Sequence, residues 1–193
     1  MTVSPILSAL YEGSTAVAEA LLAGAPELDV FEAAAAGRTE RMRELLDERP
    51  ALVREWSSDG FQPLHLAAFF GQAGAVRLLL ERGADPAVVS KHEFVKVTPL
   101  HSAVAGEGAE DLETVDALLE GGAPVNARVE GGHTPLHSAA ANGNEAVAAA
   151  LLARGGDPQA AADGGKTPLD LARENGYEKV VQLAASRADP SSP

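Results

Sequence analysis

Short apolar runs recur along the chain in pairs, and each pair is opened by proline and closed by glycine. The opening residues Pro63, Pro99, Pro135 and Pro168 are spaced by 36, 36 and 33 residues. A Leu follows each proline directly, and an Ala lies three residues beyond that Leu. A second apolar run, such as residues 76–80, comes next and ends near a glycine. A period of this length is typical of stacked structural repeats.

The residue types at the start of each period have physical reasons to recur. In Thr134-Pro135-Leu136-His137, Thr can cap a helix through its hydroxyl, and Pro suits the first helical position because that position needs no donor. The following Ala shares a helical face with Leu and lets a neighbouring helix approach, and a later Gly ends the helix. The pattern therefore predicts helix, turn, helix and loop. Such a short pair cannot bury its apolar face alone, so neighbouring pairs must stack.

The run from Gln62 to Asp85 resembles the ankyrin repeat, whose hallmark is a Thr-Pro-Leu-His opening, Ala-Ala, Gly and a Val-x-x-Leu-Leu second helix. The resemblance covers roughly residues 5–185 and is strongest for small bacterial-type ankyrin-repeat proteins. It implies an all-α ankyrin-repeat solenoid of about six helix-turn-helix units with hairpin-like loops, including degenerate caps. We expect a single domain over residues 1–185, with units near residues 5–28, 29–60, 61–96, 97–132, 133–165 and 166–185, and a disordered tail over 186–193.

Composition and charge narrow the classes of partner. Apolar residues make up 46% of the chain but aromatic residues only 4%, which favours closely packed small helices. The formal charge is −13, so the mean field repels phosphate, and we expect no nucleic-acid partner. There is no cysteine, and no apolar stretch reaches the roughly 20 residues of a membrane span. We expect a cytoplasmic monomer that does not bind a membrane.

The recurrence of three histidines suggests a metal site, but their spacing argues against one. His65, His101 and His137 recur once per repeat, and equivalent residues in a stack lie about 10 Å apart, too far to share one ion. The resemblance instead implies that each His braces its repeat and the next one through hydrogen bonds. Thr98, Thr134 and Thr167 are expected to cap the helices that follow them. We predict no metal site and no cofactor.

Signatures of catalysis are also missing. Each Gly-Gly pair falls where a repeat ends, and no glycine-rich phosphate-binding motif occurs. The sequence therefore predicts that the protein is not an enzyme, although a site assembled from distant residues stays open.

The resemblance also places a candidate partner-binding surface. In such repeats, the residues before the Thr-Pro-Leu-His opening and the two residues after Ala-Ala face the concave groove and hairpin tips. In the third and fourth units these positions hold Phe61, Phe69, Phe70, Phe94, Val95 and Val97. Equivalent positions downstream are polar and include His133, Asn142 and Lys166. We predict an aromatic centre with a polar rim, with packing of Phe69 or Phe70 against a neighbouring repeat as the alternative.

These patterns predict a non-catalytic scaffold that binds a protein of unknown identity through its concave and hairpin face. Six acids and no base lie between Glu107 and Glu120, which could steer a partner with a basic patch or could simply be solvated. Two rival readings remain: self-association through the phenylalanines, and a small-ligand or catalytic role without a recognisable motif. The sequence leaves open whether Trp56 joins the aromatic surface or covers a seam between units.

Overall fold

The computed structural model describes residues 3–24, 27–106 and 112–188, and within them all regular structure is helical. The α-helices are α1 Pro5–Tyr11, α2 Thr15–Gly24, α3 Val30–Ala35, α4 Thr39–Glu48, α5 Pro63–Phe69, α6 Ala73–Glu81, α7 Pro99–Ala105, α8 Leu112–Glu120, α9 Pro135–Asn142, α10 Glu145–Ala153, α11 Pro168–Glu174 and α12 Glu178–Ala188, with short 3-10 helices η1 Pro50–Arg54 and η2 Glu130–Gly132. The prediction of an all-α solenoid is confirmed. None of the described helices combines the length and the apolar character needed to cross a bilayer.

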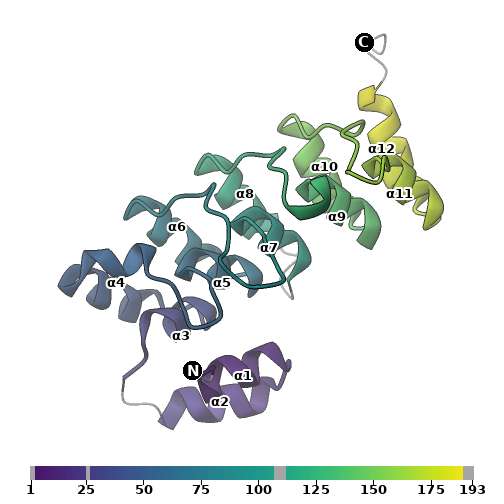
Figure 1. Ribbon diagram of the computed structural model, residues 1–193. Coiled ribbons are helices and arrows are strands. Elements are labelled where there is room, and N and C mark those ends of the chain that lie inside the picture. The colour runs from purple at the N-terminus through teal and green to yellow at the C-terminus, as the bar shows by residue number, and fades with distance from the viewer. Residues whose placement is uncertain (1–2, 25–26, 107–111, 189–193) are drawn as a thin grey trace.

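Six helix pairs follow one another along the described residues, numbered from the N-terminus, and the second to sixth of them form a regular stack. Helices α3, α5, α7, α9 and α11 make one row, here called the inner row, and α4, α6, α8, α10 and α12 make the outer row (Figure 1). Successive helices touch along each row, and the two helices of each pair touch each other. Each expected unit from 29–60 onward contains one such pair. Helix α12 continues to Ala188, so residues 186–188 of the expected tail are helical, and the rest of the tail lies outside the described residues.

Local chemistry explains where the inner helices begin. Pro63, Pro99, Pro135 and Pro168 all occupy the first helical turn. Before α11, the Thr167 hydroxyl accepts a hydrogen bond from the backbone N–H of Asp170 at 3.1 Å, and the Asp170 carboxylate accepts one in return from the Thr167 backbone N–H at 3.0 Å. This reciprocal pair is a capping box, which satisfies two donors that the helix itself leaves free.

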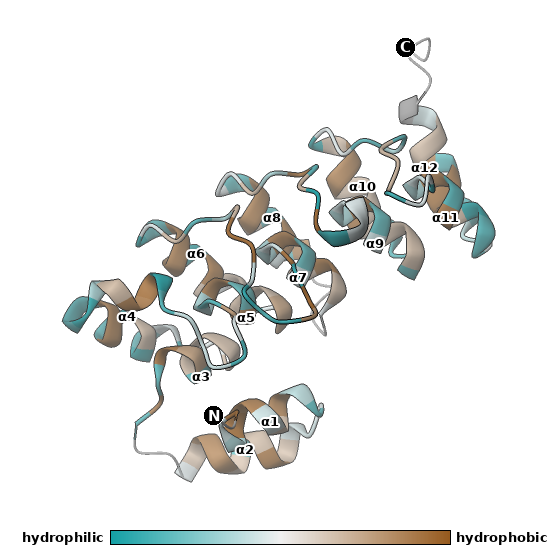
Figure 2. Cartoon of the chain, viewed as in Figure 1, coloured by the Kyte–Doolittle hydropathy of each residue, from teal (hydrophilic) through white to brown (hydrophobic). Residues whose placement is uncertain are grey.

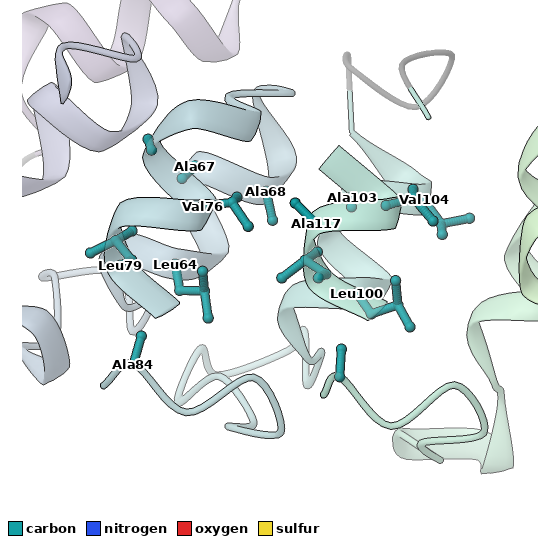
Figure 3. Close-up of a cluster of buried hydrophobic side chains, with 14 of the residues drawn as sticks. Leu64, Ala67, Ala68, Val76, Leu79, Ala84, Leu100, Ala103, Val104 and Ala117 are labelled. Carbon is teal, nitrogen blue, oxygen red and sulfur yellow. The ribbon is translucent and has the colours of Figure 1, made fainter. Parts of the chain in front are cut away.

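One continuous apolar core runs through the five stacked pairs, from Val30 in α3 to Val180 in α12. Its members are mostly Leu, Val and Ala. Between the third and fourth pairs, Leu64 and Leu100 lie among Ala67, Ala68 and Ala103, and all five are almost completely buried (Figure 3). Polar residues gather in the loops that join the pairs (Figure 2). The small alanines allow the helices to approach closely, so the core is thin but continuous.

The first helical pair, residues 5–24 and here called the first hairpin, does not extend this stack. The Tyr11 ring centroid lies 5.9 Å from that of Phe69 and 5.2 Å from that of Phe70, two units further along the chain. Residues of regularly stacked pairs two units apart would be about 20 Å apart at ordinary helix spacing. The first hairpin instead lies against the inner row, on the side of α3 that faces away from α4 (Figure 1). This differs from the degenerate end cap expected at residues 5–28.

The composition of the helices accounts for this placement. Helix α4 at the end of the stack carries six charged residues out of ten, so it offers little apolar surface to a further pair. Helix α1 carries an apolar stripe that includes Leu7, Leu10 and Tyr11. The inner row offers the apolar surface that this stripe requires, and burial there removes it from water.

Replacing Leu100 by Ala should lower the free energy of unfolding by about 2–5 kcal/mol, because the substitution leaves a cavity between the third and fourth pairs. Chemical denaturation followed by helical circular dichroism measures this change. Val17→Ala is the control, since Val17 is 54% exposed and its truncation should change the free energy by less than about 0.5 kcal/mol. Equal effects of the two substitutions would show that the core does not run through this layer.

Candidate functional site

The three repeat histidines link successive helix pairs. His65 Nδ1 accepts a hydrogen bond from the Gln62 backbone N–H at 3.2 Å, and Nε2 lies 3.1 Å from the Val97 carbonyl of the next pair. His101 Nε2 lies 3.3 Å from the His133 carbonyl, and His137 Nε2 lies 3.2 Å from the Lys166 carbonyl. Each ring therefore accepts within its own unit and donates to the loop that precedes the next one.

Burial keeps these rings neutral. It lowers the pKa of His65 and of His101 to about 4 and also lowers the pKa of His137, and the nearby His133 contributes to the lowering at both His101 and His137. A neutral ring can accept at Nδ1, as the Thr98 and Thr134 hydroxyls require at 2.8 Å. Among the described residues, no three His, Asp or Glu side chains gather as a metal-binding group. The geometry is that of a structural link between units.

The loop of residues 90–97 is ordered by its own hydrogen bonds. The Ser90 hydroxyl donates to the Val95 carbonyl at 2.6 Å and accepts from the Val97 N–H at 3.0 Å. His92 Nδ1 accepts from the backbone N–H groups of Phe94 and Val95 at 3.2 and 3.1 Å. These bonds stabilise the conformation of the loop.

The same loop is anchored on the segment that precedes α5. The Lys91 N–H donates to the Gly60 carbonyl at 2.7 Å, and the His92 ring stacks on Phe61 with centroids 5.4 Å apart. Gly60 has φ +85°, and a Cβ there would collide with the backbone of Lys91 and His92. The Lys91 ammonium lies 4.4 Å from the Trp56 ring centroid. Trp56 is half-buried, and its ring centroid lies 6.4 Å from that of His65, so the ring packs at the seam between the second and third units.

Four of the predicted aromatic and aliphatic residues meet at one small pocket. Phe61, Phe69, Val95 and Val97 line a hollow of about 120 Å³ together with Leu66 and Ala105. Its remaining lining residues include Tyr11 from the first hairpin. The pocket is almost entirely apolar, so its natural occupant is an apolar group.

The other two members of the predicted cluster lie apart from the pocket. Phe70 turns to the first hairpin and packs beside Leu7 and Leu10 at the edge of a small apolar cluster. Phe94 is 78% exposed, the most exposed large apolar side chain among the described residues. The packing alternative concerned Phe69 and Phe70: both are half-buried, with ring centroids 5.9 and 5.2 Å from that of Tyr11, so both contact the first hairpin.

Tyr11 is the residue that the sequence analysis missed. It lines the pocket, and its hydroxyl lies 3.4 Å from the Asp59 carboxylate. Burial and the negative charge of Asp59 both raise the pKa of Tyr11, so the hydroxyl stays protonated and can donate. The helical spacing of Leu7, Leu10 and Tyr11 was the available signal. The repeat pattern obscures this signal, because it assigns the segment to the end of the stack.

The predicted polar rim lies on later units and lines no part of the aromatic pocket. His133 is exposed, and its ring packs on His137 at a centroid distance of 5.1 Å. Lys166 pairs with Glu174 at 2.6 Å, and Asn142 is exposed at the end of α9. These three residues thus stand apart from the phenylalanines.

The acidic run is only partly described, since residues 107–111 lie outside the described residues. Its remaining acids pair with arginines of neighbouring units. Glu113 lies 2.6 Å from Arg77, and Arg154 lies 3.6 Å from Asp116 and 3.7 Å from Glu120. These exposed pairs across the outer row contribute little energy each, but they neutralise part of the negative field there.

Comparisons with known proteins agree with this architecture. A family model described as ankyrin repeats in three copies matches residues 6–90 and 100–193. The human neurogenic locus notch homolog protein 4 is 36% identical over 129 residues, which is 67% of this chain and 6% of that protein. The human ankyrin repeat domain-containing protein 53 is 34% identical over 114 residues, or 58% of this chain and 21% of that protein.

A third relative, the human DNA-binding protein RFXANK, is 39% identical over 72 residues, or 37% of this chain and 28% of that protein. The chain thus spans well under a third of the length of each of these relatives. The family match leaves out residues 91–99, which include Phe94. The exposed phenylalanine therefore lies between the two matched ranges.

Acidification should destabilise the protein between pH 6.5 and 4. Unfolded histidine has a pKa near 6.5, whereas folded His65 and His101 have a pKa of about 4, so unfolding takes up protons in this window. The free energy of unfolding should fall by up to about 1.4 kcal/mol per pH unit for each such histidine. Chemical denaturation at a series of pH values measures the slope.

His101→Gln provides the comparison, because every carboxylate is common to the two proteins. The variant should be less stable at pH 7 and should show a slope smaller by up to one proton between pH 6.5 and 4. Identical slopes would mean that His101 is not held neutral in the folded protein.

Proposed function

Because the chain belongs to the ankyrin-repeat family, we propose that it is a non-catalytic scaffold that binds another protein through the inner row and the adjoining loops. The names of its relatives range from a notch homolog to a DNA-binding protein, so the family alone does not identify a partner. The formal charge of −13 argues against a phosphate backbone as partner. The proposal includes that the protein is cytoplasmic and monomeric.

Phe94 is the observation that carries this proposal. A phenyl ring that is 78% exposed gains free energy when a partner covers it, by roughly 2 kcal/mol for a full side chain. The bond that Ser90 donates to the Val95 carbonyl and the bond that His92 accepts from the Phe94 N–H stabilise the loop before a partner binds. Little conformational entropy is therefore lost on binding, which is the property of a rigid aromatic anchor.

The neighbouring pocket adds a second point of contact. At about 120 Å³ it is smaller than the roughly 300–1,000 Å³ of typical small-molecule sites, so it suits a single side chain of a protein partner better than a metabolite. Phe94 and Val95 are adjacent in sequence, so an interface centred on the loop would reach both the exposed ring and the pocket wall. The small pocket beside an exposed ring favours protein recognition over a small-ligand role.

The substitution Phe94→Ala should separate binding from folding. Its effect on the free energy of unfolding should stay below about 0.5 kcal/mol, because the side chain is mostly solvated. Affinity for the partner should fall about 30-fold, the equivalent of about 2 kcal/mol for an aromatic hot spot. Capture from extract of the native cells identifies the partner, and titration of the purified partner measures the affinity.

Glu93→Ala is the matched control, since it alters the neighbouring exposed side chain without removing an aromatic anchor. Unchanged partner affinity in Phe94→Ala would remove this loop from the interface. Sedimentation that depends on protein concentration in the wild type but not in Phe94→Ala would identify the partner as a second copy of the chain.

A further inference from the structure

The inner row carries an apolar groove that is already filled by a helix of the same chain. Leu7 of α1 packs against Ala35 of α3 and Leu66 of α5, and all three are buried. This cluster is separate from the core that runs through the stack, and it is bordered by Leu10, Phe31, Phe61 and Phe70. We call this surface of α3 and α5 the inner groove. Helix α1 covers the inner groove. Without α1, the groove would expose a strongly apolar surface to solvent.

Helix α1 has the form of a small groove-binding ligand. Leu7, Leu10 and Tyr11 stand at positions i, i+3 and i+4, so they lie on one side of the helix. The Ser4 hydroxyl caps the helix by accepting from the Leu7 N–H at 3.2 Å, and Pro5 occupies the first turn. An amphipathic helix with this spacing, laid into an apolar groove, is a recurrent mode of peptide recognition.

The contacts that hold the first hairpin differ from those that join the stacked pairs. Stacked pairs are linked by histidine hydrogen bonds and by ion pairs such as Arg82–Asp47 at 2.7 Å and Lys179–Glu145 at 3.1 Å. Between described residues of the first hairpin and of the repeats, the one hydrogen bond is the 3.4 Å contact between the Tyr11 hydroxyl and the Asp59 carboxylate. Docking therefore rests on apolar contact, which is non-directional and can be reproduced by another helix.

The first hairpin is incompletely buried, because its outer face is exposed to solvent. Helix α2 has one charged residue, Glu19, yet only Ala18 of this helix is fully buried, and Val17 is largely exposed. The hairpin thus gains free energy from one face only. A longer or better matched helix could gain more from the same groove.

The pocket of about 120 Å³ shows where a better match could be made. Tyr11, the last residue of α1, forms one of its walls, opposite residues of the third and fourth pairs that include Phe69 and Val97. Helix α1 stops there, because Gly13 with φ +65° begins the turn to α2. A helix in the same register that continued for one more turn would place its i+7 side chain beyond Tyr11, beside this open space.

We propose that the inner groove is a receptor for an amphipathic helix of another protein with apolar residues at i, i+3, i+4 and i+7, and that the first hairpin occupies the groove in its absence. This inference rests on the proposed scaffold function and specifies the partner element that the inner row accepts. The partner must displace α1, so the first hairpin sets a threshold for binding. This threshold is the free energy with which the first hairpin docks in the groove. The hairpin is tethered to the repeats and is therefore present at a high effective concentration.

The probe is a synthetic, fluorescently labelled peptide with the sequence of residues 3–24, titrated into the full chain. The wild type should bind it weakly, because its own hairpin fills the groove. The full-length variant Leu7→Ser should bind it at least about tenfold more tightly, since its hairpin no longer docks. Val17→Ser is the matched control, because it alters an exposed side chain of the same hairpin and should bind as weakly as the wild type.

Two further measurements locate the peptide. Adding Phe70→Ala to Leu7→Ser should weaken peptide binding again, because Phe70 borders the groove. A peptide of residues 3–14 with Gly13→Ala and Ser14→Leu adds the i+7 side chain counted from Leu7, and it should bind more tightly than the unmodified 3–14 peptide.

Trp56, the only tryptophan, lines a surface hollow together with Leu7, so its fluorescence should report undocking in Leu7→Ser.

Equal binding of the 3–24 peptide by the wild type and Leu7→Ser, no binding by either, or no effect of Phe70→Ala would each overturn the proposal. Circular dichroism and a retained denaturation midpoint for the stacked pairs show that a variant is folded. Phe94→Ala separates the two ideas, because Phe94 lies outside the groove cluster. Loss of the cellular partner in Phe94→Ala together with a failed peptide experiment would keep the scaffold function and discard the groove receptor.

Discussion

The close approach of successive inner helices is the constraint on which the rest of the structure depends. Ala33, Ala67, Ala103, Ala139 and Ala172 occupy the same position in the five inner helices, and each is at most 1% exposed. A larger side chain there would push neighbouring pairs apart. The histidine-to-carbonyl hydrogen bonds of 3.1–3.3 Å span that same separation and would break. Alanine packing and histidine bridging therefore support each other, and together they align the loops along one edge.

The pocket of about 120 Å³ is an exception to this small-residue pattern. The position of Phe69 is held by Ala35 in the preceding pair and by Ala105 in the following pair. The aromatic side chains of the third pair thus lie between smaller side chains of the neighbouring pairs, and this leaves a hollow beside Ala105. Gly106 has a different origin, because a Cβ at this position would collide with the backbone of Phe69. Large side chains in one unit lie beside small ones in the next, and the pocket is the outcome.

The first hairpin shows that a repeat-like sequence need not stack like a repeat. The family match begins at residue 6 and includes it, yet Tyr11 lies beside Phe69 and Phe70, two units away. Its helices form for local reasons, such as the Ser4 cap and the Pro5 start. Its docking is decided by which apolar surface is available, and the charged helix α4 offers less of one than the aromatic inner row does.

The sequence by itself determined the helices, their pairing and the stack, because each of these depends on interactions within about 35 residues. The caps at Thr98 and Thr167, the buried alanines and the histidine spacing are all local and periodic, so their pattern can be read directly. The sequence also singled out Phe61, Phe69, Val95 and Val97, which meet at one pocket. Only the tertiary structure decided that Phe94 is exposed, that Phe70 is half-buried against the first hairpin and that Tyr11 joins the pocket. Those outcomes depend on apolar contacts between distant segments, and such contacts carry no fixed spacing along the chain.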